Sequence, residues 1–439
     1  MVGYTDQDFA ETLVTGDLFE GWGAGPIGFV GGLTWRDQQI NNNTLPVDID
    51  LLGPPINAPS IGIRGIPSAI QTGGPNLNLN STALVFGGQT DVWEWFAETN
   101  IPLWRFANGQ RIVSDIAVRR SDYDRSGMVD SWKIGTDIEV TSDLRLRLTR
   151  SQDTREPSFQ ELFDAQVSGG NIIDPTRNGE TYGISQTRGG NPNLRPEIAK
   201  TNTAGIVYQP SFADWIEGMS LSVDVYDVNI ADAVAQLGIQ RLVDLCYKGN
   251  DASCAVIQRG SDGRVTMILD GFLNVAGARA RGVDTELTWR RDVDFFANHS
   301  ESFNLRWITG FVSERSDTPF EGAKQDVAGG LGTPEIGSTM TANYRFDNWT
   351  VQLQARYVDE VKRNITWVEG VDVDDNTVAS MTWFNSRIGY SGELRNGGAW
   401  TVGFNIQNIF DKEPPLFGTT NNNYDGYGRR YNISANFSW

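Results

Sequence analysis

Apolar and polar residues alternate with a period of two along most of the chain. The segment 339–346 (TMTANYRF) places its apolar residues on one face, and 349–356 (WTVQLQAR) repeats the pattern after a two-residue link. Such alternation predicts β-strands with one apolar face, and a two-residue link predicts a hairpin. Helical periodicity is nearly absent, with one short turn expected around 158–165 (SFQELFDA).

Counting these runs gives about fifteen strands. They are expected near residues 5–18, 26–37, 90–104, 111–123, 128–141, 144–155, 199–209, 219–230, 280–291, 302–315, 334–346, 349–361, 382–393, 399–411 and 430–439. Many have the length of about ten residues that a tilted strand needs to cross a bilayer.

The connections between these strands alternate between short and long. Short links lie near 19–25, 105–110, 142–143, 210–218, 347–348 and 394–398, and most of the others are long and rich in Gly, Asn, Asp and Pro. A transmembrane barrel has this asymmetry, with tight periplasmic turns at one end and long external loops at the other. With a periplasmic C-terminus, every long loop is expected outside.

The polar faces of the strands carry charges that a small soluble barrel would have to bury at high cost. They include Arg145, Arg147, Asp284, Glu286, Arg290, Arg345 and Arg356. A wide barrel solvates such residues in its lumen. Trp132, Trp289, Trp349 and Trp383 lie near strand ends, where an interfacial girdle would place them. A soluble propeller or solenoid explains the alternation but not these charges. The fold class is therefore all-β, a transmembrane antiparallel up-and-down β-barrel.

Composition limits the chemistry. The 439 residues carry a net charge of −19, which excludes non-specific nucleic-acid binding as the main function. One histidine, His299, and two cysteines exclude a Cys/His zinc cluster. No catalytic constellation, metal centre or cofactor motif stands out, so we expect neither an enzyme nor a bound cofactor.

Cys246 and Cys254 lie in a polar stretch that the alternation of loops places outside the membrane. A local disulfide is favoured over two free thiols, since the outer compartment is oxidising.

Several motifs together resemble the C-terminal part of TonB-dependent outer-membrane receptors. They are REPSFQELF (155–163), GGNPNLRPE (189–197), ARARGVDTEL (278–287), NIQNIFDKEPP (405–415) and an alternating terminus that ends in an aromatic residue, Trp439. The resemblance runs over residues 1–439, a single domain.

Each motif also has a plain structural interpretation. Two prolines in NPNLRPE impose an extended entry into the next strand, and Gly282 is expected at a bend. The motif residues read as structural are Asn191, Pro192, Asn193, Leu194, Pro196, Glu197, Gly282, Asn405, Asn408, Phe410 and Trp439.

The resemblance implies a 22-stranded barrel preceded by a plug domain. About fifteen strands are counted, so we expect an N-terminally truncated fragment. The implied function is active uptake of a scarce nutrient (a siderophore, an oligosaccharide or cobalamin) across the bacterial outer membrane. The implied partners are the TonB–ExbB–ExbD complex through the plug, outer-membrane lipid and lipopolysaccharide, and a small nutrient ligand.

Aromatic residues of the external loops are the candidates for ligand contact, because they stack on sugars or on the rings of siderophores. They are Phe320, Trp367, Phe417, Tyr424 and Tyr427. The acidic loop 369–376 (EGVDVDDN) is expected to be solvated, with Ca²⁺ binding as the lesser alternative. A passive porin and a surface adhesin without transport remain the alternative functions.

Overall fold

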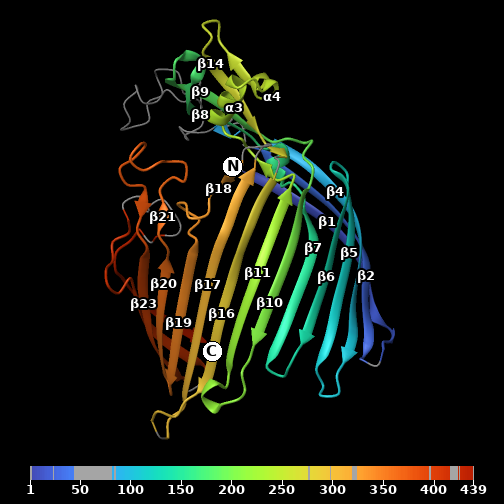
Figure 1. Ribbon diagram of the computed structural model, residues 1–439, viewed down its shortest axis with the longest axis vertical. Helices are drawn as coiled ribbons and strands as arrows, with labels where there is room; N and C mark the ends of the chain where they lie inside the picture. Colours follow the sequence, from blue (N-terminus) through green and yellow to red (C-terminus); the bar gives the residue numbers. More distant parts are fainter. Residues whose placement is uncertain are drawn as a thin grey trace.

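The computed structural model describes residues 2–22, 24–43, 82–83, 86–274, 277–296, 298–318, 324–394, 397–415, 424 and 426–438. Within these residues, one antiparallel sheet dominates the molecule, and its strands follow one another in sequence order. Figure 1 shows the sheet as a long curved wall with a small folded unit at its upper end.

The path of the main sheet runs through fifteen long strands, each hydrogen-bonded to the next. They are β1 (Val2–Glu20), β2 (Pro26–Asn43), β4 (Phe86–Arg105), β5 (Arg111–Tyr123), β6 (Gly127–Glu139), β7 (Leu144–Arg155), β10 (Glu197–Tyr208), β11 (Met219–Ala231), β16 (Gly277–Asp292), β17 (Glu301–Thr318), β19 (Ile336–Phe346), β20 (Trp349–Val358), β23 (Met381–Glu393), β24 (Ala399–Gln407) and β25 (Arg430–Ser438). A sixteenth strand, β18 (Gln325–Asp326), pairs with β17.

The prediction of an up-and-down antiparallel sheet is confirmed, with each expected strand overlapping one observed strand. The short turns lie together at the lower end of the wall in Figure 1, and the long connections lie at the upper end. In the described residues, β1 and β25 form the two ends of the hydrogen-bonded path.

The register places apolar and charged side chains on opposite faces of the sheet. On one face, Leu148 lies opposite Ala204, Ala204 lies opposite Val225, and Val225 lies opposite Val283. On the other face, Asp137 pairs with Arg147. Because neighbours in register share a face, one face is apolar across many strands and the other is polar.

Two long connections, joined by the two residues of β3 from a third, fold into a separate small unit, which we call the loop unit. It consists of β3 (Thr82–Ala83), β8 (Ala165–Asp174), β9 (Glu180–Gly189), β13 (Ile257–Arg259), β14 (Val265–Gly271), α3 (Ile239–Tyr247) and α4 (Asp251–Ala255). Its five strands form one sheet in the order β13-β14-β9-β8-β3, and β14 runs parallel to β9. The sequence pattern predicted long external loops at 156–198 and 231–279 and gave no sign of the strands and helices that these segments form.

A hydrophobic core holds the loop unit together. Its buried residues are Ile172, Ile184, Leu242, Val243, Val265 and Ile268. These side chains come from β8, β9, β14 and α3, so the core joins the two connections, which are far apart in sequence. Burial of such apolar side chains stabilises each by about 1.5–3 kcal/mol.

The remaining elements are short. They are α2 (Phe159–Phe163), η2 (Pro175–Arg177), η3 (Asp214–Ile216), β12 (Val234–Ala235), β15 (Leu273–Asn274), β21 (Val361–Lys362) and β22 (Thr377–Val378). The expected turn at 158–165 is α2, which begins with a capping box between Ser158 and Glu161. Among the described helices, none is long and apolar enough to cross a membrane.

Candidate ligand-binding site

The segment after β7 folds back over the charged face of the sheet at its upper end. The side chains of Arg36 on β2 and Glu156 after β7 lie 3.7 Å apart, although three strands separate β2 from β7. A Cβ atom on Gly88 would lie 2.3 Å from the ring of Phe163, so α2 packs directly on β4. The charged face is therefore the inner, concave face of the wall.

Ion pairs and hydrogen bonds organise this inner face. Glu94 accepts hydrogen bonds from Ser121 at 2.6 Å and from Thr34 at 3.1 Å, and Arg119 lies 3.4 Å from the same carboxylate. Arg147 forms a two-point pair with Asp224. The contacts of Glu94 join adjacent strands, and the Arg147–Asp224 pair reaches across β10, so both hold charged side chains of the inner face in place.

Glu156, beside Arg36, is a carboxyl whose pKa is strongly raised. Burial, joined by the negative charges of Asp124 and Glu94, raises the pKa of Glu156 to about 7, against the attraction of Arg36. The group therefore changes charge close to neutral pH, at the point where α2 meets the inner face.

A buried aromatic pair lies on the inner side above β20 and β23. Trp383 and Tyr424 are 4% and 5% exposed, and their ring centroids are 6.1 Å apart. The guanidinium of Arg356 lies 5.6 Å from the centre of the Trp383 ring. Trp383 pairs in register with Arg356, so it faces inward, and its expected place in an outward girdle is wrong.

This pair has two donors without a partner. In the described part of the chain, neither Trp383 Nε1 nor Tyr424 Oη makes a hydrogen bond, although both atoms are buried. Buried polar atoms are normally paired, and each exception points to strain or to an external partner. A cation, two rings and two donors at one place suit an oxygen-rich or anionic ligand.

The five aromatic residues expected to contact ligand fall into three groups. Tyr424 packs in the cluster just described, with Val358, Val361, Val378 and Met381 around it. Trp367 is 44% exposed and Tyr427 is 67% exposed, the latter beneath Arg430 at 4.8 Å. Phe320 and Phe417 lie outside the described residues. The sequence did not indicate Trp383 or Arg356 as ligand contacts.

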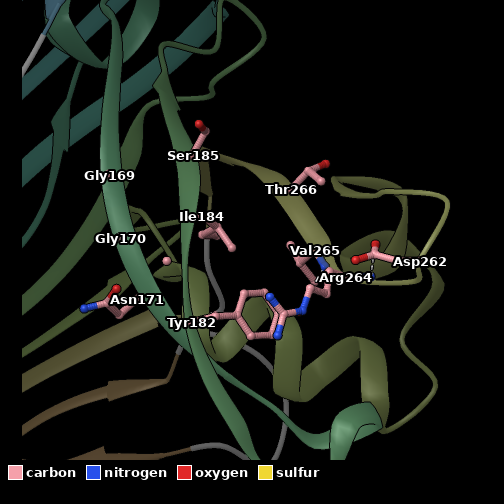
Figure 2. A pocket seen from close by; sticks show the side chains of 11 residues that line it. Gly169, Gly170, Asn171, Tyr182, Ile184, Ser185, Asp262, Arg264, Val265 and Thr266 are labelled. Atoms are coloured by element: carbon pink, nitrogen blue, oxygen red, sulfur yellow. Dashed lines mark hydrogen bonds between the residues drawn. The ribbon is translucent and has the colours of Figure 1, made fainter. Parts of the chain in front are cut away.

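The loop unit carries an open polar groove of about 600 Å³ (Figure 2). Its walls come from β8, β9 and the start of β14, and the guanidinium of Arg264 stacks over the ring of Tyr182 at 5.0 Å. Gly169 has open space where a Cβ atom would lie. Sequence reasoning missed this groove because its residues come from two connections read as loops.

Asp174, at the end of β8, anchors the neighbouring segments. It is fully buried and accepts hydrogen bonds from Tyr182 Oη at 2.6 Å, Arg259 at 2.9 Å and Thr176 Oγ1 at 2.6 Å. Burial favours its neutral form, but these bonds outweigh that effect and hold the pKa of Asp174 well below its usual range. Burial and the bond to Asp174 raise the pKa of Tyr182.

The motif NPNLRPE lies at the base of the loop unit. Asn191 receives a hydrogen bond from the Asn193 amide at 3.0 Å and donates one to the Phe272 carbonyl at 3.0 Å. Leu194 is 1% exposed. Pro196 is also buried, whereas Pro192 and Asn193 are exposed. The motif thus ties the end of one connection to the end of the other.

Glu197 continues this arrangement at the start of β10. Its carboxylate accepts hydrogen bonds from Arg155 at 2.7 Å and from the Val234 amide at 2.6 Å. Arg155 also pairs with Glu161 of α2 at 2.9 Å. One guanidinium therefore links the wall, α2 and the motif.

Three other motif residues lie at a register shift, in a cross-strand pair and in a turn. Gly282 follows a register shift, and a Cβ atom there would lie 2.2 Å from the Phe311 carbonyl oxygen. Asn405 donates to the Asn432 side chain at 3.3 Å. Asn408, at φ 52°, closes a turn through both its side-chain bonds to Lys412.

Two further residues complete the motif set. The ring of Phe410 is 71% exposed and meets Phe384 edge-on, with 5.3 Å between the ring centroids. Trp439 lies outside the described residues.

Carboxylates of the acidic loop 369–376 accept hydrogen bonds from backbone amides in or next to the same loop. Glu369 accepts from the Asn376 amide at 3.2 Å, and Asp372 accepts from the Val368 amide at 2.8 Å. Within the described ranges, no group of three or more His, Cys, Asp or Glu side chains is placed to hold a metal ion.

Cys246 and Cys254 form a disulfide that joins α3 to α4. It lies in the loop unit, at the end of the molecule where the long connections gather (Figure 1).

The chain matches the family model described as TonB dependent receptor-like, beta-barrel, over residues 3–409. It belongs to this family. No curated protein sequence gives a significant match.

Solved structures of similar fold cover 99% of this chain. They include a mutant ferric enterobactin receptor of Pseudomonas aeruginosa in complex with enterobactin (14% identity, TM-score 0.61, 54% of that chain) and the siderophore receptor PirA of Acinetobacter baumannii (14%, 0.59, 55%). The unliganded ferric citrate transporter FecA is also similar (12%, 0.52, 55%). The chain spans about half the length of these proteins.

Proposed function

We propose that this chain is part of an outer-membrane receptor that takes up a small nutrient with energy from the TonB–ExbB–ExbD complex. The observation that carries the proposal is family membership over most of the chain. A wall with an apolar outer face suits contact with outer-membrane lipid and lipopolysaccharide. The folded upper end would then meet the ligand outside the cell.

We further propose that the chain is the C-terminal barrel portion of a longer protein that also carries a plug. The support is the share of about half that it covers in each solved neighbour. Contact with TonB would go through that plug and not through the residues described here.

Among the nutrient classes, a ferric chelate is the one we favour over oligosaccharide and cobalamin. One of the neighbours is named as a ferric enterobactin receptor, one as a siderophore receptor and one as a ferric citrate transporter. The cluster of Arg356, Trp383 and Tyr424 offers one positive charge and two free donors, which suit an anionic, oxygen-rich chelate.

Uptake by living cells tests the function. Cells with the native full-length gene are compared with a gene deletion and with a TonB deletion, using ⁵⁵Fe-chelates, labelled maltooligosaccharide and ⁵⁷Co-cobalamin. Saturable uptake of one label, lost equally in both deletions, supports the proposal. Uptake that survives TonB loss indicates a passive porin, and no loss of any uptake in the gene deletion indicates an adhesin.

The inner-face cluster has its own test within the same cells. Arg356→Gln removes the charge over Trp383, and we expect a rise in the concentration for half-maximal uptake by about tenfold. Arg345→Gln is the matched control, because Arg345 also faces inward but lies near the lower end of β19. If the two substitutions change the concentration for half-maximal uptake equally, the cluster does not bind the ligand.

A further inference from the structure

A second, apolar cavity lies at the base of the loop unit. Its volume is about 480 Å³, within the range of small-molecule sites. It is bounded by α3, α4 and the adjoining ends of β9 and β14. The apolar side chains that line it include Leu237, Leu242, Leu245, Val256, Leu269 and Phe272.

One charged residue, Asp270, lines this apolar cavity. Asp270 is 2% exposed, and the alternation of β14 places its side chain on the same face as Ile268, the face that α3 covers. Burial raises the pKa of Asp270 above its ordinary value. A carboxylate in such surroundings is costly unless a partner compensates it.

The partners of Asp270 within the described residues are neutral donors. One carboxylate oxygen accepts from the Gly238 amide at 3.1 Å, and the other accepts from Gln186 Nε2 at 3.2 Å. A carboxylate has about four acceptor positions, so two stay open. Arg188 lies opposite Asp270 in the β9–β14 register, and its charge lowers the pKa of Asp270 against the effect of burial. In the described structure no hydrogen bond or ion pair joins these two side chains, so the carboxylate has no cation in direct contact.

The walls of the cavity are fixed in place. The Cys246–Cys254 disulfide joins the two helices beside it, and Asn250 caps α4 by accepting from the Ser253 amide at 2.8 Å. Asn191 fastens the floor through its bond to the Phe272 carbonyl. A site built in advance loses little free energy to ordering when a ligand enters.

We propose that this cavity binds a small, mainly apolar molecule that carries a cationic amine, with Asp270 as its counter-ion. The apolar lining would cover the body of the molecule, and the open positions on the carboxylate would accept from the ammonium group. The site lies outside the wall and does not depend on TonB-driven uptake, so it stands or falls separately from the proposed function.

The test uses two probes of almost equal size, 4-(trifluoromethyl)benzylamine and 4-(trifluoromethyl)benzyl alcohol. Their binding to the full chain in non-fluorinated detergent is followed by ¹⁹F NMR. The proposal predicts that the amine binds about tenfold more tightly than the alcohol, the typical gain from one charge-assisted hydrogen bond. Equal affinity for the two probes would overturn the role of Asp270.

Three variants locate the binding. Asp270→Asn keeps an acceptor for the Gly238 amide and removes the charge, so it should abolish the preference for the amine. Leu245→Trp adds volume to the cavity wall, so it should weaken the binding of both probes about tenfold. Asp262→Asn is the matched control. It removes an exposed charge of the same unit and should leave the affinity of both probes unchanged.

Two results would contradict the proposal whatever the folding of one variant. If Leu245→Trp leaves both probes unchanged while trypsin digestion shows an intact loop unit, the probes bind elsewhere. If Asp262→Asn lowers the amine preference as much as Asp270→Asn, the preference reflects surface charge alone. The comparison of amine and alcohol in the unaltered chain decides the matter even if Asp270→Asn does not fold.

Discussion

At the scale of single residues, two features set the pKa of each carboxyl at the upper end. They are how deeply the side chain is buried and how many hydrogen bonds it accepts. Asp174 is fully buried but receives several hydrogen bonds, so its charge is stabilised. Glu156 is partly buried, and burial destabilises its charge and raises its pKa. The two carboxyls should therefore respond to pH and to substitution in opposite ways.

Glu156 should make the folded protein less stable as pH rises from about 4.5 to about 7. The folded state binds the proton up to about pH 7, whereas the unfolded chain releases it near 4.5. Glu156→Gln should remove this loss, which is up to about 3 kcal/mol. Thermal unfolding in detergent at pH 5 and pH 8 measures it. A stability difference between variant and parent that is the same at both pH values would contradict the raised pKa.

Asp174→Asn should loosen the loop unit. The amide cannot accept from Arg259, Tyr182 and Thr176 together, and breaking a buried ion pair costs about 3–5 kcal/mol. Limited trypsin digestion should cut at Arg259 and Arg264 several times faster than in the parent. Asp251→Asn, at an exposed position of the same unit, is the control. Unchanged cleavage would mean that Asp174 does not hold these segments.

At the scale of elements, the sequence predicts the wall well and the loop unit poorly, for a physical reason. Each strand of the wall carries its own period of two, and its partner follows directly in sequence, so local patterns are sufficient. In the loop unit, β14 pairs in parallel with β9, and Met267 faces Ser185 across a long stretch of chain. No local pattern encodes such a pairing, and the three-residue β13 is too short to show alternation.

The same limit explains what was missed at the candidate sites. Tyr424 stood out as a loop aromatic, but its partner Trp383 looked like an interfacial residue until the register placed it beside Arg356. Asp270 is one acidic residue among many in the sequence, and only the fold shows that it lies among leucines. Gly282 was expected at a bend from its position alone, and it follows a register shift where a Cβ atom would lie 2.2 Å from the Phe311 carbonyl oxygen.

Removing the disulfide should destabilise the α3–α4 segment in particular. The bond closes a short loop, for which chain entropy gives about 2–3 kcal/mol. The double variant Cys246→Ser and Cys254→Ser should expose residues 246–254 to proteolysis while the strands of the wall stay resistant. Hydrogen exchange followed by mass spectrometry measures both parts at once. Equal loss of protection in the wall would contradict an independent loop unit.

The two faces of β7 should respond differently to a new charge. Leu148 lies on the apolar face and its neighbour Thr149 on the polar face. Leu148→Arg should cost about 2–4 kcal/mol if that face meets the middle of a bilayer, while Thr149→Arg should cost far less. Refolding yield and urea-dependent unfolding in lipid vesicles measure the difference. Similar costs for both variants would place the apolar face outside the hydrocarbon.

At the scale of the whole molecule, one curved sheet separates two kinds of environment and carries a folded unit at one end (Figure 1). The charged inner face explains how a chain with a net charge of −19 can have long apolar-faced strands, because the two kinds of residue alternate along each strand. Adding strands enlarges such a sheet without adding a core. For that reason length is a poor guide to the number of domains here.

Cysteine labelling on intact cells tests most directly whether this wall spans the outer membrane with the loop unit outside. Ser261→Cys places a thiol on an exposed turn of the loop unit, and Asn108→Cys places one in the exposed turn between β4 and β5. An impermeant maleimide should label Ser261→Cys in intact cells that express the native full-length gene. It should label Asn108→Cys only after the outer membrane is permeabilised. Labelling of both thiols in intact cells, or of Asn108→Cys alone, would contradict the proposed topology.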